Sequence, residues 1–409
     1  MKRSQAAVPH RDSKTGRWYI VVDVGLSPNG TRRQAFRRGF VTKAEAQRVL
    51  DELRGAARKG TFVAPTRQTL ENYLNEDWLP AVRGQLAQST WESYRRNIGN
   101  HVVPNMGRVR LQALDGAMLN RFYGHLLDNG RLLGRQSSGL KPRTVRYIHT
   151  ILHAALDDAV RWRQLPLNPA DNANPPAASH AKSPEMRVWT GAQARRFLIL
   201  TEGDRHHWPW LFLATTGRRR GEVLGLRWDD VDVDKAPALA SIRQENVPLT
   251  KASGVGREGR IVARTKGGKP RVIELDAMTV AALRAWRALQ TKERMLMGPG
   301  YQDCGLIFCQ PDGRPYHPEA FSKTFDRRIR QQAFVDLPTI RLHDLRHTWA
   351  TLALVAGVDV KLVSERLGHS SPVVTWQTYQ HVVKGMQTGA AEKVAALIFG
   401  TPGDPGHGS

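Results

Sequence analysis

Apolar residues recur at a helical period near the C-terminal end of the chain. From Leu342 to Val355 they fall three or four positions apart, as on one face of an α-helix, and a glycine follows two residues later as a natural stop. Val360 to Leu367 predicts a second helix that ends at Gly368. A short helix or an extended tail is then expected to carry Tyr379.

The region before these helices alternates between helical and strand-like patterns. The apolar run Trp208 to Ala214 leads into the sequence TTGRRRGE, which begins a helix ending near Leu226. Arg264 to Leu275 predicts a β-hairpin: a basic strand, a Gly-Gly turn and an alternating apolar strand. A short strand is expected at Leu306 to Phe308, and a terminal helix at Lys384 to Phe399.

The stretch from about residue 70 to 173 has a wholly helical pattern. Ser89 is expected to cap the second of its helices, with Glu92 at the capping-box position. The four helices are predicted at Leu70–Val82, Ser89–Val103, Asp115–Asn129 and Pro142–Gln164.

The N-terminal residues predict a small separate module. Arg17 to Val22 and Arg32 to Arg38 are rich in strand-forming residues, and the turn sequence SPNG separates them. A third strand is expected at 39–41, and the capping-box sequence TKAE opens a helix that runs to about Arg58. The module is therefore predicted as a sheet of two or three strands plus one helix.

Two segments predict domain boundaries. Thr61 to Arg67 has the composition of a linker, and Leu165 to Pro184 holds five prolines. We therefore expect an N-terminal module at 1–62, a helical domain at 66–175, a mixed α+β domain at 185–395 and a flexible tail at 396–409. A chain of 409 residues is long enough for such domains to bury cores of their own.

Charge and composition narrow the class of partner. The chain carries 61 Lys and Arg against 37 Asp and Glu, a formal net charge of +24. Such an excess favours a polyanion, because bound phosphates release condensed counterions. Two cysteines are too few for a disulfide framework, so we expect reduced thiols in a cytoplasmic protein. The sequence predicts no signal peptide, membrane-spanning run or P-loop.

The residues around the two C-terminal helices suit phosphoryl transfer. His343 and Arg346 are three apart, so they lie on one helix face and can converge on one small anion. His369 follows the second helix directly, and Tyr379 lies ten residues further on. Arginine binds two phosphate oxygens in a bidentate fork, histidine moves protons near neutral pH, and a tyrosine hydroxyl can attack phosphorus.

The order and spacing of these residues resemble a known family. His343-x-x-Arg346, the LGH sequence that ends at His369, and the TY pair at Tyr379 are similar to the motifs of the tyrosine recombinase (phage integrase) family. The resemblance implies a multidomain, mainly α fold. It would contain an arm-binding module of sheet plus helix, a helical core-binding domain and an α+β catalytic domain.

The resemblance also assigns residues upstream. TGRRRGE matches the family pattern T-G-x-R-x-G-E, which places a catalytic arginine at Arg219 and a supporting carboxylate at Glu222. By composition alone, the neighbouring arginines are expected to form ordinary basic surface. The Thr-Lys pair before the hairpin turn matches the position of the family's general-acid lysine, which assigns Lys266, with Lys269 as its rival.

The chemistry that the resemblance implies is DNA strand cleavage and rejoining without ATP, cofactor or metal. Tyr379 would attack the scissile phosphodiester, Arg219 and Arg346 would clamp its oxygens, and Lys266 would protonate the leaving 5′-oxygen. His343 would assist proton transfer and His369 would donate a hydrogen bond to the phosphate.

The implied partners are double-stranded DNA attachment sites and three further copies of the chain, which together form a homotetramer on DNA. A DNA-bending host factor and an excisionase are further expected partners, in the nucleoid of a bacterial host cell. The DNA-contact candidates are basic side chains of the N-terminal strands and of the last core-binding helix, namely Arg32, Arg33, Arg37, Arg143 and Arg146.

The sequence leaves several alternatives open. A type IB topoisomerase-like enzyme would use the same chemistry as a monomer, and a basic DNA-binding protein could carry the fold with Tyr379 idle. The acidic run from Asp229 to Asp234 could suggest a metal site, although such residues are commonly solvent-facing. Tyr301 and Tyr316 are rival tyrosines that lie outside the family spacing.

Overall fold

The computed structural model describes residues 8–26, 31–58, 62–131, 138–181, 186–248, 259–262, 270–386 and 398. The packing of the chain separates two compact units, Met1–Pro184 and Glu185–Ser409. The first unit contains one hydrophobic core in its N-terminal sheet module and another among the helices that follow. The largest core of the second unit surrounds Trp210 and Phe325.

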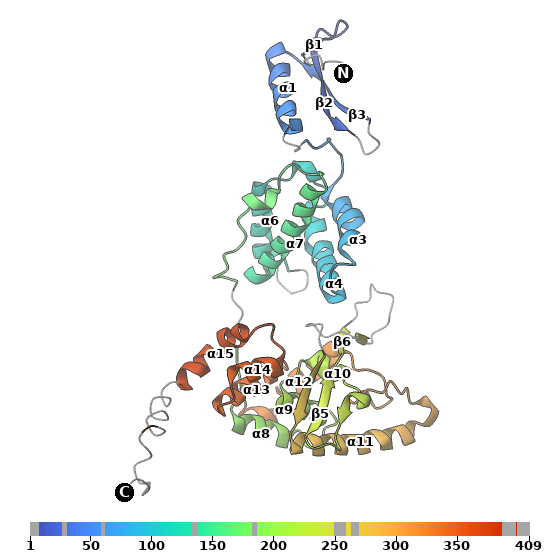
Figure 1. Ribbon diagram of the computed structural model, residues 1–409, viewed down its shortest axis with the longest axis vertical. Helices are drawn as coiled ribbons and strands as arrows, with labels where there is room; N and C mark the ends of the chain where they lie inside the picture. Colours follow the sequence, from blue (N-terminus) through green and yellow to red (C-terminus); the bar gives the residue numbers. More distant parts are fainter. Residues whose placement is uncertain are drawn as a thin grey trace. The chain divides into compact units, whose positions relative to one another are not determined.

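The N-terminal module is a small antiparallel sheet with one helix packed on it. Its elements are β1 (His10–Arg11), β2 (Trp18–Leu26), β3 (Arg32–Phe40) and α1 (Lys43–Arg58) (Figure 1). In the described sheet β2 is central and pairs with both other strands. Ile20 and Val22, alternate residues of β2, are buried against Ala46 and Leu50 of α1.

The helix of this module begins as predicted, but one predicted strand is wrong. Thr42 accepts a hydrogen bond from the backbone of Glu45 at 3.1 Å, and the Glu45 carboxylate accepts one from the Val41 backbone at 3.2 Å. The expected third strand at 39–41 does not form, because Phe40 ends β3 by pairing with Trp18. The third strand is β1, whose two residues are too few to show an alternating pattern.

The second part of this unit is helical, as predicted. Its helices are α2 (Leu70–Asn72), α3 (Leu79–Val82), α4 (Gln88–Asn97), α5 (Val103–Met106), α6 (Gly116–Asn129) and α7 (Pro142–Arg161). π-Helical turns at Tyr73–Trp78 and Ile98–Val102 join α2 to α3 and α4 to α5. The predicted cap at Ser89 is wrong, since α4 begins one residue earlier and Ala87 is its N-cap.

The second unit combines short antiparallel strands with eight described helices. Its described strands are β4 (Val231–Asp232), β5 (Ala238–Ile242), β6 (Glu245–Pro248), β7 (Gly259–Val262) and β8 (Arg271–Leu275). Its described helices are α8 (Gly191–Leu200), α9 (His207–Thr216), α10 (Arg220–Gly225), α11 (Ala277–Met297), α12 (Pro318–Arg328), α13 (Asp344–Val355), α14 (Val360–Leu367) and α15 (Pro372–Met386). The order β4-β5-β8 forms one sheet and β6-β7 another.

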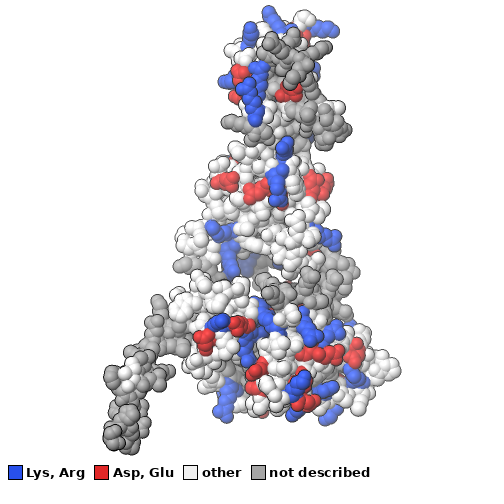
Figure 2. Space-filling model, viewed as in Figure 1, with Lys and Arg blue, Asp and Glu red and all other residues white. Residues whose placement is uncertain are grey.

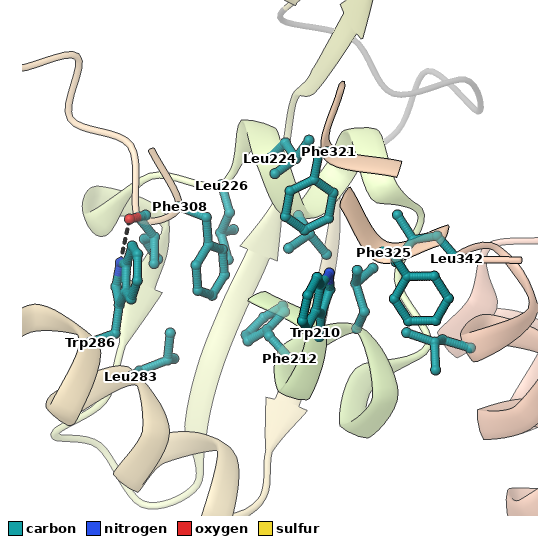
Figure 3. Close-up of a cluster of buried hydrophobic side chains, with 14 of the residues drawn as sticks. Trp210, Phe212, Leu224, Leu226, Leu283, Trp286, Phe308, Phe321, Phe325 and Leu342 are labelled. Carbon is teal, nitrogen blue, oxygen red and sulfur yellow. Dashed lines mark hydrogen bonds between the residues drawn. The ribbon is translucent and has the colours of Figure 1, made fainter. Parts of the chain in front are cut away.

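An aromatic core fixes the helices of this unit. Trp210 and Phe212 of α9 are buried with Phe325 of α12, and Trp286 of α11 donates a hydrogen bond to the Ile307 carbonyl at 2.5 Å (Figure 3). The centroids of the Trp210 and Phe325 rings lie 5.8 Å apart. Because α9 is held in this way, the turn at its C-terminal end has a rigid support.

The helices at the C-terminal end of the described chain form a second, smaller cluster. Ala350 and Leu354 of α13, Val363 and Leu367 of α14, and Tyr379 of α15 are buried together. Figure 1 shows these three helices grouped beside α8 and α9. The predicted bounds of α14 are confirmed, and α15 is a helix rather than an extended tail.

Three other predictions are wrong or only partly described. The expected strand at Leu306–Phe308 is wrong: Leu306 makes only an isolated bridge with Arg227. Residues 263–269 lie outside the described residues, so of the predicted hairpin only β8 is described, and it pairs with β5. Most of the predicted terminal helix and the whole tail after residue 398 also lie outside them.

No helix in the described part of the chain is long and apolar enough to cross a bilayer.

Candidate functional site

One wall of the site is the turn between α9 and α10. Gly217 ends α9 with a φ of +66°, and a Cβ there would lie 2.7 Å from the Trp349 ring of α13. Only glycine therefore allows this close approach without strain. Arg219 follows as the N-cap of α10. Glu222 accepts hydrogen bonds from its backbone nitrogen at 3.1 Å and from its Nη1 at 3.0 Å.

Glu222 links two guanidinium groups. It is 1% exposed and accepts a second charged hydrogen bond from Arg271 of β8. Burial raises the pKa of Glu222, but Arg218, Arg271 and Arg219 together outweigh it and hold the pKa below its ordinary value. Glu222 is therefore ionised at neutral pH and orients Arg219.

The opposite wall is the turn that ends α14. Gly368 has a φ of +69°, and the carbonyl groups at this helix end accept hydrogen bonds from three arginines. Arg346 Nη2 donates to the Leu367 carbonyl at 2.8 Å, and Arg271 Nη1 to the same oxygen at 3.4 Å. Arg219 Nη2 donates to the Gly368 carbonyl at 3.2 Å. The three guanidinium groups are thus gathered at the residue before His369.

Arg346 connects the two walls. It is 3% exposed, and its Nη1 donates to the Gly217 carbonyl at 3.0 Å. Burial, with Arg219 nearby, lowers the pKa of Arg346 to about 10, so the group still carries its charge at neutral pH. The site therefore presents at least two fixed cations to an anion.

Two predicted histidines face these arginines in their neutral form. His369 Nδ1 is 2.7 Å from the Thr375 hydroxyl, which leaves Nε2 as its ring nitrogen for a ligand. Burial is the largest cause that lowers the pKa of His369 to about 4, and the positive charges of Arg346 and Arg219 lower it further. Burial, together with His347, lowers the pKa of His343 to about 4. Both imidazoles are uncharged at pH 7.

The Tyr379 hydroxyl lies in the same cluster, bonded to a histidine that the sequence analysis did not assign. Its oxygen is 2.7 Å from Nδ1 of His347 on α13. Tyr379 is fully buried; burial raises its pKa to about 12, and Arg346 acts in the opposite direction. The backbone of α15 leaves helical geometry at this residue, with φ −117° and ψ 17°. His347 stacks edge-on with His343 at 5.2 Å.

A simple signal could have identified His347. It lies four residues after His343, so both rings are expected on the same face of α13. Arg271 has no comparable signal, because its role depends on contacts with residues about 50 and 96 positions away in the chain.

The remaining predicted residues lie elsewhere. Lys266 and its rival Lys269 fall outside the described residues. Arg32 and Arg33 belong to β3, but their side chains are not described. Arg37 pairs with Ile20 on the sheet face that α1 covers, and it is half-buried. Arg143 and Arg146 are exposed on α7, where Arg146 donates to the Pro176 carbonyl at 2.9 Å.

The rival tyrosines belong to other networks. Tyr316 accepts a hydrogen bond from Arg205, and the Tyr301 hydroxyl lies 3.6 Å from Cys309 Sγ. Neither network includes a described residue of the site. The tyrosine that the structure brings to the arginine cluster is Tyr379.

The acidic side chains that could suggest a metal site lie beside basic or histidine side chains of the protein. Asp230, Asp232 and Asp234 lie within ion-pair distance of Arg243, Lys235 and Arg284. In the described part of the chain, the one cluster with metal-ligand spacing is His153, Asp157 and Asp171, where the two ring nitrogens of His153 face different carboxylates.

Figure 2 shows Lys and Arg interspersed with Asp and Glu over the visible face of the second unit. The feature of this region that suits an anion is therefore the guanidinium cluster at the end of α14.

Three family models match separate stretches of the chain. A model described as phage integrase family matches residues 205–386, which include every described residue of the site. An arm DNA-binding domain model matches residues 10–56, and a phage integrase N-terminal SAM-like domain model matches residues 69–127.

Similar proteins match over nearly the whole chain. An integrase of Streptomyces ambofaciens is 26% identical over 384 residues, which cover 93% of this chain and 94% of that protein. The ICEBs1 integrase of Bacillus subtilis is 24% identical over 395 residues, with coverages of 94% and 98%.

Solved structures share the fold. The Tn1549 transposon integrase in complex with transposon right end DNA has a TM-score of 0.61 at 20% identity, covering 80% of this chain and 100% of that one. The lambda integrase tetramer bound to a Holliday junction has a TM-score of 0.54 at 16% identity, with coverages of 92% and 96%.

Proposed function

This chain belongs to the phage integrase family of tyrosine recombinases, and we propose that it cleaves and rejoins DNA strands through a 3′-phosphotyrosyl link to Tyr379. The observation that carries this proposal is the position of the Tyr379 hydroxyl. It lies 2.7 Å from His347, in a buried cluster that also contains Arg346. The site is built from the turn between α9 and α10, from β8, α13 and α15, and from the turn that ends α14, and its Arg, His and Tyr side chains suit phosphodiester chemistry.

The scissile phosphate binds between Arg219 and Arg346. Both guanidinium groups are already fixed, Arg219 by Glu222 and Arg346 by the Gly217 and Leu367 carbonyls. Preorganised cations stabilise the charge that develops on the non-bridging oxygens, because they need no reorganisation during the reaction. His369, neutral and held by Thr375, donates an Nε2 hydrogen bond to the same phosphate.

The nucleophile is activated by proton transfer to His347. Its Nδ1 accepts the Tyr379 proton, and the edge-on ring of His343 stabilises the charge that forms. The tyrosine oxygen then bonds to phosphorus, and the bond from phosphorus to the 5′-oxygen breaks. Lys266 supplies the proton to that leaving oxygen. Since the buried hydroxyl must reach phosphorus, α15 rearranges at Tyr379 when DNA binds.

The second half of the reaction reverses these steps. A 5′-hydroxyl from another duplex attacks the phosphotyrosine and displaces Tyr379, so the strand is resealed without ATP. Exchange between two duplexes requires four active sites, and the enzyme therefore acts as a homotetramer on DNA. It integrates or excises a phage or mobile element in the bacterial cytoplasm, at the nucleoid, with a DNA-bending host factor and an excisionase that set direction.

The domains divide this work. Residues 1–62 bind arm sites distant from the crossover, and residues 66–175 and 185–395 each bind the core site. The match of the N-terminal residues to an arm DNA-binding domain supports this division. It also favours a recombinase over a topoisomerase-like enzyme, which needs no arm site.

A suicide duplex tests the proposal. A nick near the cleavage position of the attachment site lets the 5′-hydroxyl fragment escape, so the covalent protein–DNA adduct accumulates. Wild-type protein should give this adduct on a denaturing gel, and Tyr379→Phe should give none while binding DNA normally. Tyr316→Phe is the matched control and should behave as wild type. Adduct formation by Tyr379→Phe would show that another residue is the nucleophile.

A further inference from the structure

Arg218 is a buried guanidinium that the proposed chemistry does not use. It lies in the turn between α9 and α10 and is 1% exposed, although its sequence context predicted basic surface. Its Nε donates to the Thr216 carbonyl at 3.3 Å. Within the part of the chain that the structure describes, neither Nη1 nor Nη2 has a hydrogen-bond partner. A buried charge without a partner is strongly destabilising.

The groups around Arg218 do not balance its charge. The carboxylate that acts on it is Glu222, which already accepts hydrogen bonds from Arg219 and Arg271. The other groups that act on it are cations, Arg346 and Arg271 first. The described site therefore holds more guanidinium groups than one buried carboxylate can neutralise. Burial lowers the pKa of Arg218 to about 9, so it remains charged at pH 7.

We propose that Arg218 is a buried positive charge of the anion site, which strengthens binding and cleavage of the scissile phosphate without touching it. This inference rests on the proposed function. An anion held by Arg219 and Arg346 supplies the negative charge that Arg218 lacks. Because the surroundings are poor in water, a charge acts there over a longer distance than it would at a surface. Arg218 thus destabilises the protein when the site is empty and strengthens the binding of the phosphate when it is present.

Two readouts separate this role from ordinary packing. The first is thermal unfolding with and without inorganic sulfate, at constant ionic strength set with sodium chloride. The second is the single-turnover rate of adduct formation on the suicide duplex. The variants are Arg218→Met, which keeps the volume and removes the charge, and Arg218→Lys, which keeps the charge. Arg220→Met is the control, since Arg220 bonds to Ser322 Oγ at 2.6 Å, outside the site.

Without sulfate, Arg218→Met should unfold at the wild-type temperature or above it, because a buried unpaired charge is gone. It should gain less stability from sulfate than wild type, and it should cleave on the order of ten- to a hundredfold more slowly. Arg218→Lys should keep most of the sulfate response and of the rate. Arg220→Met should match wild type in both.

Three outcomes would overturn the proposal. Arg218→Met could cleave and respond to sulfate as wild type does, which would make the charge irrelevant. Arg218→Met could unfold at a lower temperature than wild type, which would show that Arg218 stabilises the fold through a structural partner. Wild type could gain nothing from sulfate, which would mean that the site does not bind anions. If wild type fails to cleave but responds to sulfate, the proposed function is wrong, and the sulfate comparison alone decides the role of Arg218.

Discussion

The hydrogen bond between Tyr379 and His347 is the residue-scale feature on which the proposed chemistry depends. From the sequence, His343 is expected to assist proton transfer with Tyr379, whereas the structure places His347 Nδ1 at 2.7 Å from the Tyr379 hydroxyl. A phenol whose pKa burial raises to about 12 needs an acceptor to react at neutral pH. His347 meets this need in its neutral form.

His347→Gln should separate positioning from proton transfer. Glutamine keeps a hydrogen bond to Tyr379 but accepts no proton, so adduct formation should slow on the order of a hundredfold or more while DNA affinity is unchanged. The single-turnover rate on the suicide duplex measures this loss. A variant that cleaves at the wild-type rate would show that His347 only packs against the tyrosine.

The pH profile of the same pair gives a second readout. Burial lowers the pKa of His347 below 6.5, Arg346 and Arg341 lower it further, and Asp344 acts in the opposite direction. The wild-type rate should therefore stay flat through neutral pH and fall only as pH drops below that lowered pKa. In His347→Gln this acid limb should vanish, and the rate should keep rising with pH towards the pKa of Tyr379.

At the scale of elements, two glycine turns hold the site together. Gly217 lets α9 pass close to Trp349, and Gly368 ends α14 where three arginines meet the helix carbonyls. A Cβ on Gly368 would lie 1.0 Å from Arg271 Nη1. The backbone geometry of these turns therefore determines where the guanidinium groups and His369 stand.

Gly368→Ala should damage both stability and activity, and Gly357→Ala should damage stability alone. Each glycine has a positive φ, +69° and +84°, so each substitution should cost roughly 1 to 2 kcal/mol of backbone strain. Gly357 has nothing within 4 Å of its missing Cβ, whereas Gly368→Ala must also displace Arg271. Denaturant midpoints and adduct rates would measure the two effects. Equal adduct rates for the two variants would contradict the role of the Gly368 turn.

The sequence predicted the local parts of this site better than its long-range contacts. The bounds of α14 and its stop at Gly368 follow from a local pattern, and so does the pairing of Arg219 with Glu222. Arg271 and Arg218 were missed because their surroundings are built by distant parts of the chain. Strand β1 and the wrongly predicted strand at 306–308 show the same limit, since two or three residues carry no period.

At the scale of the whole molecule, the N-terminal sheet has an exposed face that the sequence did not identify and that suits the proposed contact with DNA. Successive residues of a strand point to opposite faces of the sheet, so Arg38 lies on the face opposite to that of Arg37. Arg38 pairs with Tyr19 on the face away from α1, where the Tyr19 and Phe36 rings lie 5.5 Å apart. Phe36 is 52% exposed. An exposed aromatic beside an arginine suits contacts with thymine methyl groups and guanine in a major groove.

Arg38→Ala should therefore weaken arm-site binding more than Arg37→Ala. The loss of one base contact costs about 1 to 3 kcal/mol, whereas the half-buried Arg37 is held on the covered face. Fluorescence anisotropy of the full chain, with duplexes that wild type selects from a random pool, would measure both. A larger loss for Arg37→Ala would mean that DNA meets a different edge of the sheet.

The position of the covalent bond is the first measurement to make. The adduct from the suicide duplex is digested with nuclease and trypsin, and the modified peptide is located by mass spectrometry. Tyrosine chemistry at this site predicts a 3′-linked nucleotide on the peptide that runs from Leu367 to Lys384, in which Tyr379 is the one tyrosine. A nucleotide on any other peptide, or no adduct from protein that binds the duplex, would contradict it.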